Sequence, residues 1–352
     1  AAVREAEQRM LASTQHKGYI SPMGNMAYCR QVSALVLGQG HRRLQDANPV
    51  MAQTPGAGGS LRMAAEVIKQ LRPGSRIWFP DPVWLHQIDF FRNAGLEIRH
   101  YRYYDVETGA LQVDAMLEDL AAMRRDDVLI LHGSCHNPTG EDPPLWLWQQ
   151  LSDLALRTGA IPLVDLAYQG FGDGIEADVA GLRLMAAAVP QMILVVSSSK
   201  SFGIYRDRAG LLALLHDNPQ EADKLRVLLR DRIRANYFMP PDHGAQLIAT
   251  ILEDADLSRM WREELDAVRT RIHSLRQLLR REVELAVPGF DAAFLERQKG
   301  MFSCLPVSPA QQLRLENEFG LFMLPNARLN FAALAQKQAT RVAQAFAAVR
   351  AG

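Results

Sequence analysis

Along the chain, short runs of consecutive apolar residues alternate with longer segments in which apolar residues recur every three or four positions. The short runs are typical of buried strands, and the longer segments are typical of amphipathic helices. Strands are predicted at residues 76–79, 97–103, 127–132, 161–165 and 192–196, and helices at 60–71, 84–94, 113–124 and 145–158. This alternation predicts an α/β fold with a largely parallel sheet between helices, and such sheets bind ligands beyond the carboxyl ends of their strands.

The C-terminal third of the chain has a different pattern. A helical pattern with few breakers runs from Gln246 to about Glu284 and predicts one long helix leaving the sheet. After Pro288, short strands at 301–305 and 327–331 alternate with helices at 308–319 and 336–350, which indicates a second, smaller α/β domain. We therefore divide the chain into a large domain, 17–267, and a small domain, 268–352 together with 1–16.

Composition narrows the class of protein. The 352 residues carry 39 Lys and Arg against 39 Asp and Glu, so no net charge favours a nucleic acid or an anionic membrane surface as partner. No apolar run approaches the roughly 18 residues that span a membrane. Three cysteines without a CxxC motif indicate a reducing compartment, and we expect a cytoplasmic protein. Because the sequence starts at Ala1 rather than Met, we expect further natural residues before it.

One lysine stands directly after the last predicted strand of the sheet. The run SSSKSFGIYRDRAG places Lys200 at the end of the apolar stretch 192–196, with Arg208 in the same segment. A lysine amine at the mouth of a sheet can form a Schiff base with an aldehyde, while hydroxyls and a guanidinium can hold a phosphate. The segment predicts a cradle for pyridoxal phosphate. The alternative is an exposed lysine in a polar turn.

Other polar and aromatic residues follow neighbouring strands. The Gly-rich stretch 53–60 precedes a helix, whose N-terminal N–H groups and dipole favour a phosphate. Asp165 can pair with a protonated pyridine nitrogen, and the Tyr168 hydroxyl can donate to the phenolate oxygen of the ring. Trp84 can stack on an aromatic cofactor. Each feature also has an ordinary structural explanation: a turn, a helix-capping aspartate, and packed aromatic side chains.

The segment LHGSCHNPTG, residues 131–140, ends another strand in a turn. Asn137 before Pro138 is a common turn signal. His132, Cys135 and His136 resemble metal ligands in type, but the two histidines lie across a strand-to-turn junction, where their spacing does not place them on one face. We therefore predict no metal site here.

A series of segments, taken together and in order, resembles the aspartate and aromatic amino acid aminotransferases, which are fold type I pyridoxal phosphate enzymes. The resemblance runs from about Tyr19 to the C-terminus. The segments are KGYISP, QTPGAGGSLR, PVWLHQ, HYRYYD, LHGSCHNPTG, DLAYQGF, SSSKSFGIYRDRAG, IRANYFMPPDHGA, GMFS and ARLNFAAL. The resemblance implies a mostly parallel, seven-stranded-type sheet flanked by helices, plus a smaller α/β domain.

The resemblance also implies a pyridoxal 5′-phosphate site. Lys200 matches the lysine of the Schiff base, and Asp165 matches the carboxylate that pairs with the pyridine nitrogen. Asn137 and Tyr168 match the groups that hydrogen-bond the ring oxygen. The phosphate cup is matched by Ser197, Ser199, Arg208 and the backbone N–H groups of Ala57 and Gly58. Trp84 matches the tryptophan against the ring, and His132 matches the histidine beneath it. Tyr19 matches a tyrosine that reaches the phosphate from the neighbouring subunit.

Two arginines match the groups that bind carboxylates of the substrate. Arginine suits this role because its guanidinium donates two parallel hydrogen bonds to a carboxylate. Arg328 matches the arginine for the α-carboxylate. Arg234 matches an arginine that crosses to the neighbouring subunit and binds the distal carboxylate of a dicarboxylic substrate. The resemblance therefore implies a homodimer with shared active sites. The other expected substrate-binding residues are Trp84, Asn137 and Phe302.

Several positions depart from the family pattern. Gly56 and Gly58 stand where the phosphate loop usually carries hydroxyls, which predicts weaker binding of the cofactor. His86–Gln87 replaces Asn-His, which alters the support of Asp165. Phe238–Met239 replaces Ser-Asn, which makes the surroundings of Arg234 more apolar. We also expect the family's N-terminal arm to have no counterpart here.

The resemblance implies an aminotransferase with ping-pong chemistry between an aspartate or aromatic amino acid and 2-oxoglutarate. One alternative is a catalytically weak or regulatory dimer on the same fold. Another is a pyridoxal phosphate enzyme of a different reaction type, such as a decarboxylase or lyase, because one fold hosts several chemistries.

Overall fold

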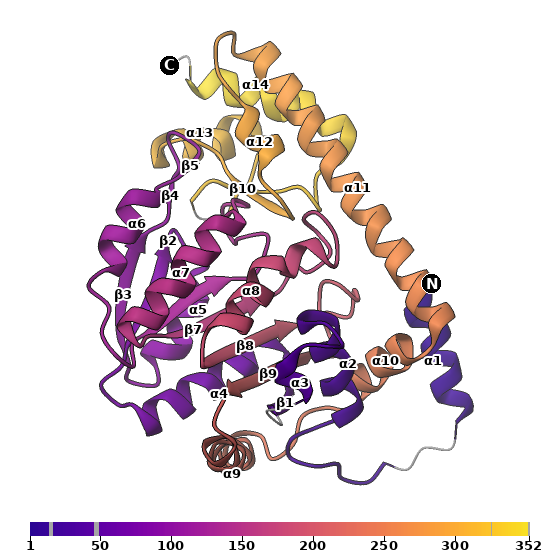
Figure 1. The fold of residues 1–352 in the computed structure, drawn as a ribbon. Helices are drawn as coiled ribbons and strands as arrows, with labels where there is room; N and C mark the ends of the chain where they lie inside the picture. The colour runs from indigo at the N-terminus through magenta and orange to yellow at the C-terminus, as the bar shows by residue number, and fades with distance from the viewer. Residues whose placement is uncertain (14–16, 46–48, 325, 351–352) are drawn as a thin grey trace.

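The computed structural model describes residues 1–13, 17–45, 49–324 and 326–350. Its centre is a seven-stranded sheet (Figure 1). In spatial order the strands are β1 (Val50–Pro55), β9 (Ala209–His216), β8 (Gln191–Ser197), β7 (Ile161–Leu166), β6 (Val128–His132), β2 (Arg76–Asp81) and β3 (Glu97–Arg102). Strands β8 to β3 pair in parallel, and β9 is antiparallel to both neighbours. The predicted α/β fold with a mainly parallel sheet is confirmed.

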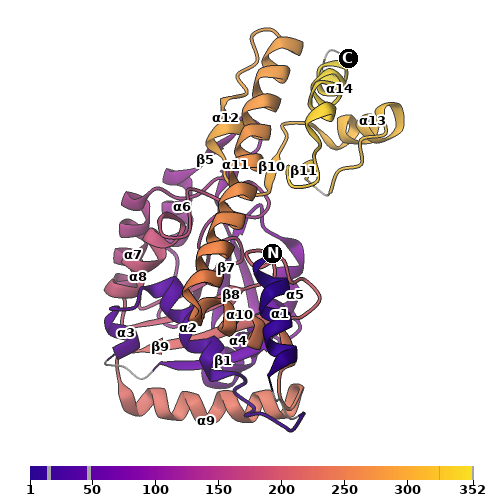
Figure 2. The same ribbon diagram turned by 90° about the vertical axis from the view of Figure 1, so that its right-hand side faces the viewer.

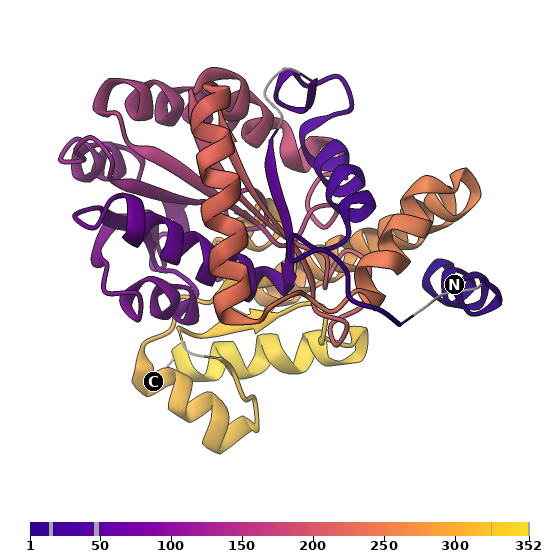
Figure 3. The same ribbon diagram turned by 90° about the horizontal axis from the view of Figure 1, so that it is seen from below.

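Helices cover both faces of the sheet, which explains why its central strands are almost wholly apolar. One face carries α2 (Met26–Leu37), α7 (Leu145–Thr158) and α8 (Ala180–Ala188), and the other carries α4 (Gly56–Leu71), α5 (Leu85–Arg92) and α9 (Pro219–Asn236). Successive residues of a strand point to opposite faces, so Leu163 belongs to the core beneath α4 while Val164 belongs to the core beneath α7. Figure 3, which views the molecule from below, shows α9 running across the strands of the sheet.

The long helix predicted from Gln246 to Glu284 is two helices, α10 (His243–Glu253) and α11 (Ala255–Ala286). Asp254 separates them with an extended backbone, and its side chain caps α11 by accepting from the N–H of Leu257 at 2.9 Å. A capping aspartate competes with helix continuation, which the apolar spacing alone did not reveal. Helix α11 then connects the sheet region to the C-terminal elements, while α1 (Ala2–Ala12) packs beside α10 and α11 (Figure 2).

The C-terminal elements form a smaller layer around α11. They are α12 (Ala293–Arg297), β10 (Phe302–Cys304), α13 (Pro309–Phe319), β11 (Arg328–Asn330), the short helix η2 (Gln336–Gln338) and α14 (Ala339–Arg350). Strands β10 and β11 pair in antiparallel fashion, with Cys304 opposite Arg328. This pairing places Phe302 and Arg328 on neighbouring strands, and both residues line the pocket described below.

Short elements complete the described chain: α3 (Arg42–Gln45), β4 (Tyr104–Asp105), β5 (Ala110–Leu111), α6 (Val113–Leu120) and η1 (Ala177–Val179). Helix α6 is shorter than the predicted 113–124, because the chain turns at residues 121–122 toward β6. Within the described residues, no helix is both long and apolar enough to cross a membrane.

Candidate active site

A pocket of about 430 Å³ lies where β6, β7 and β8 end at their carboxyl edge and where β10 and β11 face the sheet. It brings together every residue predicted for the site except Tyr19 and Arg234. The lining residues are Ala57, Gly58, Trp84, Phe90, His132, Ser134, Asn137, Asp165, Ala167, Tyr168, Ser197, Ser199, Lys200, Tyr205, Arg208, Phe302 and Arg328. The roles assigned to these residues stay predictions, but their convergence is a property of the structure.

Lys200 lies in the turn directly after β8, so the end of a buried strand fixes its position. Its amine lies 5.0 Å from the centre of the Tyr168 ring. Burial lowers the pKa of the Lys200 amine, and the nearby Asp165 carboxylate opposes that effect. A lowered pKa increases the neutral, nucleophilic fraction of the amine.

Asp165 is held at the base of the pocket by one hydrogen bond and offers a second oxygen to a ligand. Its Oδ2 accepts from Gln87 Nε2 at 2.7 Å, while its buried Oδ1 has no hydrogen-bond partner among the described residues. Burial raises the pKa of Asp165 to about 6. An unpartnered buried carboxylate oxygen is costly, so a cationic N–H donor in the pocket would stabilise it.

A chain of hydrogen bonds fixes the orientation of Asp165. The backbone N–H of Asn137 donates to His132 Nδ1 at 3.2 Å, so the other ring nitrogen, Nε2, carries the proton and donates to Gln87 Oε1 at 3.1 Å. The Gln87 amide then donates to Asp165. Burial lowers the pKa of His132 to about 4, which keeps the ring neutral. The departure at His86–Gln87 therefore does not leave Asp165 without support, because the fully buried Gln87 supplies it.

Gln87 is a site residue that sequence reasoning did not include, and the same is true of four residues in the pocket lining: Phe90, Ser134, Ala167 and Tyr205. In the sequence, the one indication of a site role for Gln87 was its position close to Trp84 in the first turn of a predicted helix. Its hydrogen bond to Asp165 becomes visible only in the structure. His86, next to it, points away and is exposed.

One end of the pocket has the properties of an anion site. The first turn of the 16-residue helix α4 carries Ala57 and Gly58, whose N–H groups are at the positive end of the helix dipole. Arg208 lies opposite and donates to Ser199 Oγ at 3.5 Å and to the Tyr205 carbonyl at 3.1 Å. Hydroxyls, N–H groups and a guanidinium around one space suit a phosphate.

Gly56 precedes these residues and has a positive φ of 68°. A Cβ atom there would lie 2.3 Å from Nη2 of Arg208. Position 56 therefore favours glycine because of its backbone conformation, and a side chain there would also displace the end of the Arg208 side chain.

The opposite side of the pocket presents Arg328. Its Nη1 donates to Asn137 Oδ1 at 2.5 Å, and its guanidinium carbon lies 4.5 Å over the ring of Phe302. Its buried Nε has no hydrogen-bond partner among the described residues. Asn137 also donates to the Tyr168 hydroxyl at 3.5 Å. A pre-positioned guanidinium without a carboxylate partner suits a carboxylate ligand.

His132 and His136 are neighbours without forming a metal centre. Their ring centroids are 4.5 Å apart, and His136 is stacked on Tyr103 and bonded to Thr139 Oγ1 at 2.9 Å. Among the described residues, no group of three or more His, Cys, Asp or Glu side chains could hold a metal ion.

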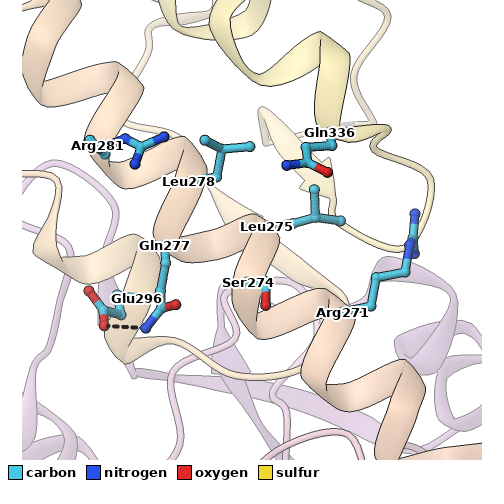
Figure 4. Close-up of a pocket in the computed structure, with 8 residues that line it drawn as sticks. All are labelled: Arg271, Ser274, Leu275, Gln277, Leu278, Arg281, Glu296 and Gln336. Carbon is cyan, nitrogen blue, oxygen red and sulfur yellow. Dashed lines mark hydrogen bonds between the residues drawn. The ribbon is translucent and has the colours of Figure 1, made fainter.

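A larger hollow, about 680 Å³, is lined by residues of α11, α12 and η2 (Figure 4). Gln277 on α11 donates to Glu296 on α12 at 3.1 Å across it. The remaining side chains that line it are Arg271, Ser274, Leu275, Leu278, Arg281 and Gln336. It contains none of the residues predicted to carry chemistry, so its size alone does not make it the site.

Tyr19 and Arg234 lie outside the pocket. Tyr19 is 83% exposed, and its ring centroid lies 5.7 Å from that of Phe238, which is itself 52% exposed. Arg234 is exposed in the last turn of α9, just before Phe238. The two residues expected to serve a neighbouring subunit are therefore both exposed and outside the pocket of their own chain.

Comparison with known proteins agrees with this geometry. The family model described as aminotransferase class I and II matches residues 1–346. The chain is 38% identical to the aspartate aminotransferase of Escherichia coli over 99% of the chain and 88% of that protein, and 39% identical to the tyrosine aminotransferase of Rhizobium meliloti over 98% and 87%. A crystal structure of the aromatic-amino-acid aminotransferase of Burkholderia pseudomallei, covalently bound to pyridoxal phosphate, superposes with a TM-score of 0.96 at 36% identity, covering 99% of this chain and 87% of that one. The chain belongs to the class I and II aminotransferase family.

Proposed function

We propose that this protein is a pyridoxal 5′-phosphate-dependent aminotransferase that moves an amino group between an aspartate or aromatic amino acid and 2-oxoglutarate. The observation that carries the proposal is the unpartnered Oδ1 of buried Asp165, in the same pocket as the Lys200 amine and the free Nε of Arg328. The relatives named as aspartate and tyrosine aminotransferases support the substrate class.

The residues present fit the cofactor. Asp165 Oδ1 would accept from the ring nitrogen and hold its proton, while the α4 N–H groups and Arg208 would hold the phosphate together with Ser197 and Ser199. When bound, pyridoxal phosphate supplies an electron-withdrawing ring that stabilises negative charge at the α-carbon of the substrate. The ring stabilises this charge best when its nitrogen is protonated, and the role of Asp165 would be to keep that proton in place.

The other groups of the pocket orient the substrate and move its proton. With pyridoxal phosphate bound, Lys200 would hold it covalently, and the Lys200 amine, once freed by the substrate amine, would carry the proton between the substrate α-carbon and the cofactor's C4′ carbon. Arg328 binds the α-carboxylate, and Asn137 keeps its guanidinium oriented. Phe302 packs against both Arg328 and the ring of Tyr168, which restrains these two side chains.

An absorption spectrum of the purified protein, recorded before and after adding glutamate, tests this function. We expect a band of the lysine-bound cofactor that converts to the amine form, with release of one equivalent of 2-oxoglutarate. A cofactor band that glutamate and aspartate leave unchanged would favour the weak or regulatory dimer. Release of carbon dioxide or ammonia instead of conversion would favour a decarboxylase or lyase.

We propose a homodimer with shared active sites, because Tyr19 and Arg234 are both exposed and lie outside the pocket of their own chain. The three cysteines, Cys29, Cys135 and Cys304, are free and buried, which suits the reducing cytoplasm where we propose the enzyme acts.

Mixing Lys200→Ala chains with Arg234→Ala chains tests shared sites. Each hybrid dimer would contain one intact site, so equal mixing should restore roughly a quarter of the wild-type activity on dicarboxylic substrates if the dimer is isologous. The activity is measured after subunit exchange has been confirmed by native mass spectrometry. Exchange without any recovered activity would show that Arg234 serves its own chain.

Arg234→Leu tests the substrate class. Loss of a charged hydrogen-bonded pair should lower kcat/KM for aspartate and glutamate on the order of 10²-fold, or about 3 kcal/mol, and spare phenylalanine and tyrosine. Phe238 and Met239 make the surroundings apolar, and an arginine can move aside or stack on a ring, so we expect wild-type activity on both classes. The control is Arg230→Leu, an exposed arginine on the same helix that pairs with Asp231. Equal losses for all four amino acids would assign Arg234 a structural role.

A further inference from the structure

We propose that Phe90 is a positioning residue for the phosphate end of the pocket, where its ring takes the room that a side chain at position 58 would need. The pair Gly58 and Phe90 would then set the affinity for pyridoxal phosphate. This inference rests on the proposed cofactor and deepens it. It concerns two residues of this chain, one on α4 and one on α5, that both line the pocket.

Gly56 and Gly58 of the phosphate loop are present for different reasons. Gly56 has a positive φ, whereas the φ of Gly58 lies outside that region, so the backbone at position 58 admits any residue. Glycine is otherwise unfavourable within the first turns of a helix, because it loses the most conformational entropy on folding. A local contact must therefore account for glycine at position 58.

That contact is the ring of Phe90. A Cβ atom on Gly58 would lie 3.3 Å from Cζ and 3.8 Å from Cε1 of Phe90, and no other atom lies within 4 Å. The first distance is shorter than an ordinary van der Waals contact, and the further atoms of a larger side chain would approach the ring more closely. Phe90 is partly buried and packs against the core beneath α4, which restrains its ring on that side.

Position 58 can therefore contribute only its backbone N–H group to the phosphate site, and no side-chain donor. A hydroxyl in the first turn of α4 would add a donor where the helix dipole already favours an anion. With Phe90 in place, the donors are the N–H groups of the turn, Ser197, Ser199 and Arg208. A smaller side chain at position 90 together with a hydroxyl-bearing side chain at position 58 should therefore tighten phosphate binding.

A double-mutant cycle tests this pair. The proteins are wild type, Gly58→Thr, Phe90→Val, and the double variant, in which the smaller side chain at 90 leaves room for threonine. For each unliganded protein we would measure the Kd for pyridoxal phosphate, the Kd for pyridoxal, which lacks the phosphate, and the midpoint of thermal unfolding.

We expect Gly58→Thr alone to weaken pyridoxal phosphate binding about tenfold and to lower the unfolding midpoint, because the ring must move. The double variant should recover stability and bind pyridoxal phosphate at least threefold more tightly than wild type, with no such gain for pyridoxal. Additive effects on both quantities, or tighter binding by Gly58→Thr alone, would overturn the inference. If the two substitutions are non-additive in the unfolding midpoint but additive in the Kd for pyridoxal phosphate, the positioning role is overturned. Gly58 and Phe90 would then affect only the packing between α4 and α5. Failure of wild type to bind either probe, with the stability coupling present, would instead contradict the proposed function.

Discussion

The Lys200→Ala protein is expected to keep its fold and to lose turnover by at least about 10⁴-fold, because one side chain supplies both the covalent attachment and the proton transfer. Among the lysines of the described residues, Lys200 is the one that lines the pocket. Lys299 lies outside the pocket lining and donates a hydrogen bond to the Asp173 carboxylate. Steady-state kinetics with glutamate and aspartate, alongside circular dichroism, would measure the loss and verify the fold.

A chemical readout separates the role of Lys200 from a general loss of the site. Borohydride reduction of the wild-type protein loaded with pyridoxal phosphate should fix the cofactor on Lys200, which peptide mapping identifies. The variant should bind cofactor without covalent fixation. The matched control is Lys69→Ala, a surface lysine that donates to the Gly95 carbonyl and lies outside the pocket. Label on another lysine of the wild type, or undiminished transamination by the pure variant, would remove Lys200 from the mechanism.

The strands of the central sheet were predictable where burial on both faces enforces an unbroken apolar run. Residues 161–166 form such a strand, and every one of them is buried. Strand β9 was not anticipated, although Ala209–His216 is equally apolar, because a run rich in Leu and Ala is compatible with either a helix or a strand. Its antiparallel placement between β1 and β8 is decided by tertiary pairing.

The candidate site was predictable to the extent that its residues stand at strand ends. Asp165 and Lys200 are brought together because β7 and β8 are parallel neighbours. Gln87 was noted as a departure but not as a site residue, because its contact with Asp165 depends on how α5 packs over the sheet. The positions of Tyr19 and Arg234 relative to a neighbouring site stay predictions, as does the division into a large and a small domain.

Asp165→Asn is expected to lower kcat on the order of 10²- to 10³-fold, the size of effect seen when one preorganised electrostatic partner is removed. Asparagine keeps the shape of the side chain and can still accept from Gln87, so the change isolates the charge. Without a carboxylate the ring nitrogen loses its proton, and negative charge at the substrate α-carbon is less stabilised. Asp165→Glu, which retains a carboxylate, should recover part of the activity. Single-turnover kinetics with aspartate and glutamate measure the chemical step directly.

The same substitution should make the unliganded protein more stable, which distinguishes it from a change that damages the fold. Burial raises the pKa of Asp165 to about 6 in the folded protein, above its ordinary value of 3.8, so folding favours the protonated form. The stability from this group is present below the ordinary pKa and is lost as the pH rises through about 6. Asp165→Asn should therefore raise the thermal midpoint of cofactor-free protein at about pH 8 and lose most of that advantage near pH 4. A loss of activity below threefold, or a variant less stable than wild type at pH 8, would show that Asp165 serves the fold rather than the cofactor.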